Sequence, residues 1–195
     1  MKPAFWTVLL AAVLVAACGT TPPSKLYTLE SQAAAGSRNA TGTPKVEIVG
    51  VRIPELWDRP QIVLTKSGGQ VDFSEFNRWA VPLKAEVPRV VTRNLVHLLD
   101  TPTIWLREDF PGAKPDLRVQ ISIDQLEAVA GQHLGLEATW VVRTTDSAAA
   151  YKVGRTSLRE PLADASYEAV VAATNRALLA MSREIAKDIQ ASPAR

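Results

Sequence analysis

The chain has 195 residues, a formal net charge of +2 and a single cysteine, and 47% of its residues are hydrophobic. This length is typical of one domain with a core of its own. The near-neutral charge gives no support for a nucleic-acid partner or for binding to an anionic membrane surface. One cysteine cannot form a disulfide within the chain, so the hydrophobic core has to hold the domain together.

The first seventeen residues have the pattern of a secretory signal peptide. Residues 1–3 are short and basic, residues 4–16 are apolar apart from Thr7, and small residues come directly before Cys18. A membrane-spanning helix requires roughly 20 apolar residues, more than this stretch offers. The sequence Val15-Ala16-Ala17-Cys18 resembles a bacterial lipobox, which implies that Cys18 becomes the first mature residue and carries acyl chains such as palmitate. An ordinary signal peptide with a nearby cysteine is the alternative interpretation.

We therefore predict a signal peptide over residues 1–17, a lipidated tether over residues 18–24 and one folded domain over residues 25–195. Attachment through two or more acyl chains is stable, because each buried methylene contributes about 0.8 kcal/mol. Gly19 stands where lipoproteins retained in the inner membrane often have aspartate. By resemblance, this implies a lipid-anchored protein of the outer membrane of a Gram-negative bacterium, with its domain facing the periplasm.

Short strands and polar loops are predicted for the first half of the domain. Strands are expected over residues 26–29, 46–53, 61–65 and 70–80. The segment 31–44 is rich in Ala, Gly, Ser and Thr and is expected to form a flexible loop. Residues 54–60 form a loop bounded by two prolines, and Ser67-Gly68-Gly69 is expected to be a turn.

The pattern of residues 83–99 predicts an amphipathic helix, since apolar residues recur there at helical spacing. Pro88 lies within this pattern and lacks the amide hydrogen that a helix interior requires. We expect the helix to begin near Lys84 or later, which would place Pro88 in the first turn, where proline is tolerated.

A meander of three antiparallel strands is predicted after a short strand at residues 103–107. Residues 116–124 alternate strictly between apolar and polar, as in a strand with one buried and one wet face. Residues 134–142 alternate likewise, and residues 148–158 form a weaker third strand.

The chain ends in a predicted helix over about residues 166–190, whose apolar residues form one stripe. Asp164 or Ser166 is expected to cap its start, with Glu168 in the first turn. The order of strands, helix, four strands and helix predicts an α+β fold. We expect a two-layer domain in which two helices pack on one face of a mixed, mostly antiparallel sheet.

Several short motifs in this order resemble the ABC-type transport auxiliary lipoprotein family. The motifs are the lipobox, Leu26-Tyr27-Thr28-Leu29, the strand ending Arg52-Ile53-Pro54-Glu55-Leu56, and Trp79-Ala80-Val81-Pro82-Leu83 before the first helix. The resemblance covers nearly all of the mature chain, and none of these motifs is a catalytic signature.

The resemblance implies a non-enzymatic accessory subunit of an MCE/ABC-type intermembrane lipid transport system. The implied partner is a tunnel-forming MCE protein anchored in the inner membrane, and neither a cofactor nor nucleic acid is implied. Self-association into a homo-oligomer is left open. One alternative is a free-standing lipoprotein that binds a lipid or other hydrophobic ligand between helices and sheet, and a more distant one is a periplasmic hydrolase.

Residues that could carry chemistry are few and scattered. His97 and His133 lie far apart in the sequence with no unmodified cysteine beside them, which argues against a metal site. No Gly-x-Ser-x-Gly elbow and no phosphate-binding loop motif appears. We therefore predict no catalytic, cofactor-binding or metal-binding residues.

Aromatic residues offer a candidate surface for a partner. Leu56, Trp57 and Arg59 lie in the proline-bounded loop, and we predict that these three residues contact a partner, because exposed aromatic residues concentrate in interfaces. The alternative is that Trp57 folds back and caps the sheet. Trp79 is expected to pack beside the entry of the first helix, where Pro82 fixes the chain.

Overall fold

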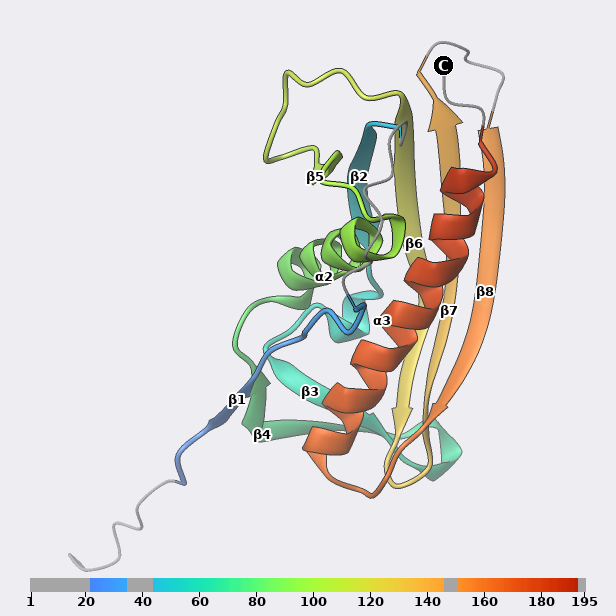
Figure 1. Ribbon diagram of the computed structural model, residues 1–195. Coiled ribbons are helices and arrows are strands. Elements are labelled where there is room, and N and C mark those ends of the chain that lie inside the picture. Colours follow the sequence, from blue (N-terminus) through green and yellow to red (C-terminus); the bar gives the residue numbers. More distant parts are fainter. Residues whose placement is uncertain (1–21, 35–43, 146–150, 193–195) are drawn as a thin grey trace, which may run out of the picture.

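The computed structural model describes residues 22–34, 44–145 and 151–192. In these residues eight strands form one mixed sheet, and two long helices pack against each other on one of its faces (Figure 1). The predicted α+β fold is therefore confirmed. The strands are β1 (Lys25–Tyr27), β2 (Val46–Arg52), β3 (Gln61–Thr65), β4 (Val71–Trp79), β5 (Ile104–Leu106), β6 (Leu117–Val129), β7 (His133–Thr144) and β8 (Tyr151–Pro161). The helices are α2 (Leu83–Leu99) and α3 (Tyr167–Gln190), with short 3-10 turns at η1 (Glu55–Trp57) and η2 (Ser67–Gly69).

The longest strands form the antiparallel meander that the alternating pattern predicts. β6 pairs with β7, and β7 pairs with β8. On β6, Leu117, Val119 and Ile121 are buried, while Arg118 and Gln120 between them are exposed. The core therefore lies between the helices and one face of the sheet, and the opposite face of the meander is open to solvent.

The other edge of β6 is shared by two parallel neighbours. β2 pairs with β6 from Leu117 to Ser122, and β3 meets it further along at Val129. β5 pairs with the far side of β2, whereas β4 and then β1 extend the sheet beyond β3. This topology brings the loop after β2, the start of α2 and the loop after β5 to one edge of the molecule.

Helix α3 is fixed at both ends. Ser166 caps its start as predicted, because Ser166 Oγ accepts a hydrogen bond from the amide of Ala169 at 3.1 Å. Near the other end, Asp188 accepts a hydrogen bond from Trp140 Nε1 at 2.9 Å and forms an ion pair with Lys152 Nζ at 2.6 Å. These contacts hold α3 against β7 and β8.

Helix α2 spans Leu83–Leu99, the predicted range, but Pro88 lies in its second turn. The expectation that Pro88 falls in the first turn is therefore wrong. Pro82 precedes the helix in an extended conformation, and its carbonyl accepts hydrogen bonds from the amides of Ala85 and Glu86 at 2.9 and 3.0 Å. Pro88 is buried, so the packing of its ring offsets part of the cost of the missing helical hydrogen bond.

The segment after β1 crosses both helices. Leu29 is buried, and the amide of Glu30 donates to Asn175 Oδ1 on α3 at 3.1 Å. Ser31 Oγ donates to Asn94 Oδ1 on α2 at 2.7 Å. The start of the expected flexible loop is thus held against α2, and the rest of that loop lies largely outside the described residues.

Candidate functional site

The proline-bounded loop connects β2 to β3 and is pinned at both ends. In its 3-10 turn η1, the amide of Trp57 donates to the carbonyl of Pro54 at 2.9 Å. At the other end, the carbonyl of Pro60 accepts a hydrogen bond from the amide of Trp79 at 2.7 Å. The loop therefore presents a surface of defined shape, with little conformational entropy left to lose on binding.

The structure separates the three residues that were predicted to form a partner interface. The Trp57 side chain is 1% exposed and belongs to the hydrophobic core, as in the alternative in which it caps the sheet. Leu56 is 37% exposed. The guanidinium carbon of Arg59 lies 4.2 Å from the centroid of the Phe73 ring. Leu56 is therefore accessible to a partner and Arg59 partly so, whereas Trp57 supports the loop from below.

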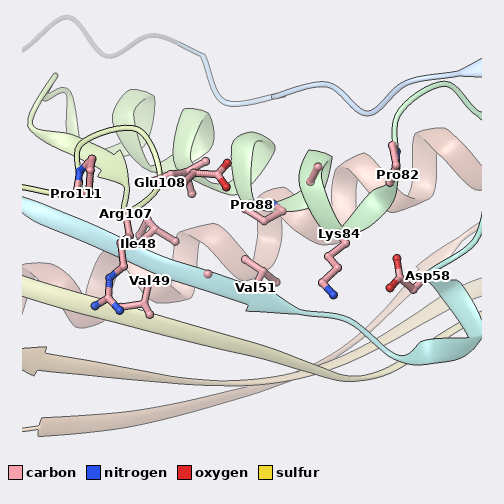
Figure 2. A pocket seen from close by; sticks show the side chains of 13 residues that line it. Ile48, Val49, Val51, Asp58, Pro82, Lys84, Pro88, Arg107, Glu108 and Pro111 are labelled. Carbon is pink, nitrogen blue, oxygen red and sulfur yellow. The ribbon is translucent and has the colours of Figure 1, made fainter.

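A groove of about 690 Å³ opens beside this loop (Figure 2). One wall is β2, another is the first part of α2, and the third is the chain that follows β5. The apolar lining includes Val51 on β2, Pro88 on α2 and Pro111 after β5. No local pattern predicts this groove, because three segments that are far apart in the sequence build it.

The groove follows a stretch of β2 that has no neighbouring strand on one side. β5 pairs with β2 only from Val46 to Ile48, where the amide of Arg107 donates to the carbonyl of Ile48 at 3.0 Å. From Gly50 to Arg52, no strand in the described part of the chain pairs with that side of β2. An unpaired sheet edge presents backbone donors and acceptors that can bind an extended peptide.

Lys84 and Pro88 of helix α2 both line the groove. Because Pro88 has no amide hydrogen, the carbonyl of Lys84 lacks the hydrogen bond that the fourth residue along a helix normally provides. Figure 2 places Lys84 and Asp58 at the same end of the groove. At the far end, Glu108 pairs with Arg89 at 3.4 Å. The groove thus has charged ends and an apolar middle.

The remaining residues considered from the sequence do not form a site in the described structure. Cys18 lies outside the described residues, so its lipidation stays a prediction. His97 and His133 are partly buried on α2 and at the start of β7. Within the ranges that the structure describes, no group of three or more His, Cys, Asp or Glu side chains could hold a metal ion. In the same ranges, every helix is too short or too polar to cross a membrane.

Two titratable groups hold the segment around β1 against the rest of the domain: Tyr27, which lies in the Leu26-Tyr27-Thr28-Leu29 motif, and Glu86, which no motif marks. Glu86 on α2 is 8% exposed, and burial raises the pKa of its carboxyl group despite a hydrogen bond with the backbone of Leu29. Burial also raises the pKa of Tyr27 to about 12, and the hydrogen bond from its hydroxyl to Glu168 at 2.9 Å acts in the same direction. Both groups serve the attachment of the N-terminal segment.

Comparison with known protein families finds a match to the ABC-type transport auxiliary lipoprotein component over residues 27–186. Comparison with curated proteins finds no match. Crystal structures of other proteins share the fold. One, of an uncharacterized protein, has a TM-score of 0.70 at 14% identity, and the match covers 86% of this chain and 99% of that chain. Another, of a Xanthomonas campestris protein of family DUF330, has a TM-score of 0.68 at 14% identity and covers 84% and 93%.

Proposed function

Because the chain belongs to the family of ABC-type transport auxiliary lipoprotein components, we propose that it is a non-enzymatic accessory subunit of an ABC-type transport system. In this proposal it is a lipid-anchored protein of the outer membrane that faces the periplasm. It works with a tunnel-forming MCE protein of the inner membrane to move lipids between the two membranes. The observation that carries the proposal is the family match, which runs from the end of β1 into α3.

The position of β1 supports a defined orientation of the domain on the membrane. Seven peptide steps separate Cys18 from Lys25 at the start of β1, and a fully extended chain of that length reaches at most about 25 Å. Leu26 on β1 and Phe73 and Phe76 on the neighbouring β4 are exposed apolar side chains. An acylated Cys18 would therefore keep the β1–β4 end of the sheet near the membrane surface.

We assign the groove beside the proline-bounded loop to the transport partner. Its unpaired edge from Gly50 to Arg52 offers backbone hydrogen bonds to an extended segment of a partner protein. Its apolar middle offers contact area to the side chains that alternate along such a segment. An acyl chain on the same edge would leave these backbone groups unsatisfied, which costs free energy. Leu56 and Arg59 on the adjoining loop would extend the contact.

Filling the groove tests this assignment. Ala85 lines the groove on α2, and Ala85→Trp would occupy it without removing a core side chain. Ala172 is a partly exposed alanine on α3 that lies outside the groove, so Ala172→Trp is the matched control. We expect Ala85→Trp to reduce co-purification of the transport partner by about ten-fold or more, equivalent to about 1.4 kcal/mol. Equal recovery with both variants, at unchanged melting temperatures, would contradict the assignment.

A free-standing lipid carrier is the second candidate function, and the apolar middle of the groove is the observation that favours it. The same pair of variants separates the two functions. If the protein is a lipid carrier, Ala85→Trp should purify with less bound lipid than the wild type does. The amount of any transport subunit that purifies with it should not fall. Mass spectrometry of the solvent extract of each purified variant measures the bound lipid.

A further inference from the structure

The open face of the sheet carries a row of side chains from five neighbouring strands. The strand registers place Trp105, Glu47, Arg118, Arg143 and Tyr151 side by side, on β5, β2, β6, β7 and β8 in that order. Side chains alternate along a strand, and the residues that flank this row on β2, β5 and β6 are buried in the core. The row therefore lies on the face away from the helices.

One carboxylate in this row holds two arginines. Glu47 Oε2 accepts hydrogen bonds from Arg107 Nη2 at 2.9 Å and from Arg118 Nε at 3.1 Å. The Glu47 side chain is only 4% exposed, whereas the two arginine side chains are about half exposed. A guanidinium has five N–H donors, so both arginines keep donors for another acceptor.

A third arginine adds a charge that the row does not neutralise. Arg143 lies directly opposite Arg118 on the antiparallel strands β7 and β6, and like charges in this arrangement destabilise a sheet. The guanidinium carbon of Arg143 lies 5.3 Å from the centroid of the Tyr151 ring, and no carboxylate pairs with it in the described part of the chain. Three positive charges therefore share one negative charge at this place.

The three arginines line a hollow of about 210 Å³ on the open face. Its lining consists of Val49, Arg107, Arg118, Gln120, Val141 and Arg143. Guanidinium groups present their N–H donors in a planar fork that matches the oxygens of phosphate. Forks from β6, from β7 and from the segment after β5 meet at this hollow, and the Gln120 amide adds further donors. We propose that the hollow binds a phosphate group, either as free phosphate or as the phosphate of a lipid headgroup.

A bound phosphate would remove the electrostatic conflict, because its negative charge would lie between Arg118 and Arg143. The site can be tested separately from the proposed docking groove even though Val49 and Arg107 line both. Arg143 lines the hollow and not the groove, whereas Ala85 lines the groove and not the hollow. A failure of one proposal is therefore distinguishable from a failure of the other.

Arg143→Gln is the central variant of the test, because Arg143 does not hold Glu47 and its replacement leaves that buried carboxylate paired. Arg159→Gln is the matched control, since Arg159 is an exposed arginine on β8 that does not line the hollow. Arg143→Lys keeps the charge and removes the fork, and it carries the test should the glutamine variant fail to fold. Isothermal titration calorimetry on the purified full-length lipoprotein in non-ionic detergent measures binding of inorganic phosphate at constant ionic strength.

We expect saturable phosphate binding by the wild type and by Arg159→Gln, and binding weakened by about ten-fold or more in Arg143→Gln. Arg143→Lys should show an intermediate loss. In a second arm, glycerol 3-phosphate replaces inorganic phosphate as the soluble fragment of a lipid headgroup. Tighter binding of glycerol 3-phosphate assigns the site to headgroups, and equal binding assigns it to free phosphate. No saturable binding of either probe, or equal weakening by Arg143→Gln and Arg159→Gln, would overturn the proposal.

Discussion

Ile121 and Gln120 are neighbours in the chain, yet they meet opposite environments. Ile121 is buried beneath the helices, and Gln120 is exposed on the open face. Ile121→Ala should lower the free energy of unfolding by about 2–5 kcal/mol, because it removes buried methyl groups and leaves a cavity. Gln120→Ala should change it by less than about 0.5 kcal/mol. Urea unfolding followed by circular dichroism measures both values, and equal losses would mean that β6 is packed differently.

Glu86 makes the stability of the domain depend on pH. Burial raises the pKa of its carboxyl group above the usual 4.5, so the folded protein binds this proton more tightly than the unfolded chain does. The free energy of unfolding therefore falls as the pH rises above the usual pKa. Glu86→Gln keeps an acceptor for the Leu29 backbone without the charge. We expect this variant to be more stable than the wild type at pH 7 and similar to it at pH 4.

The comparison for Glu86 uses urea unfolding of both proteins at the two pH values. The quantity of interest is the difference between variant and wild type, because other carboxyl groups titrate in both proteins and cancel. If the difference in unfolding free energy between variant and wild type is the same at pH 4 and pH 7, folding does not raise the pKa of Glu86.

Helices and strands whose apolar residues recur at a regular spacing could be predicted from the sequence. Features that depend on packing against segments far away in the sequence could not. The alternation around Ile121 and the stripe of α3 reflect burial of one face, so the sequence carries both directly. The expectation for Pro88 was wrong because its burial in the second turn of α2 depends on the sheet beneath the helix. The burial of Trp57 depends on where its loop folds, which the loop sequence leaves open.

The proline-bounded loop is the element through which we expect a partner to add contacts outside the groove. Replacing Leu56 and Arg59 together by alanine should weaken co-purification of the partner and shift the melting temperature little, since Leu56 is exposed, Arg59 is only partly buried and neither belongs to the hydrophobic core. Trp57→Ala should instead lower the free energy of unfolding by about 3–5 kcal/mol, because the indole is buried. A large loss of stability in the double variant with unchanged co-purification would remove the loop from the interface.

In the whole molecule, the two surface features of interest arise from strand order and register. The groove exists because β5 stops pairing with β2 at Ile48, and the charged row on the open face exists because β2, β6 and β7 align Glu47, Arg118 and Arg143. Arginines at these positions have no shared spacing in the sequence, so the row could not be recognised before the strands were aligned. Long-range pairing of this kind leaves no local signal.

In the proposed function, attachment of the whole chain to the membrane rests on Cys18. Cys18→Ser should abolish acylation and move the protein out of the outer-membrane fraction, while the melting temperature of the domain stays unchanged, because the tether precedes β1. Density-gradient fractionation of the cell envelope, with mass spectrometry of the N-terminal peptide, measures both. Continued stable partition of Cys18→Ser with the outer membrane would contradict the lipid anchor.

Crosslinking in the intact cell envelope tests most directly whether this lipoprotein is a transport accessory subunit. The tagged wild-type protein is crosslinked mildly and purified, and its partners are identified by mass spectrometry. We predict a crosslink to a subunit of an ABC-type transport system that contains an MCE protein, reduced by about ten-fold or more in Ala85→Trp and retained in Ala172→Trp. Recovery of an acylated, outer-membrane-associated lipoprotein without any such transport subunit would contradict the proposed function.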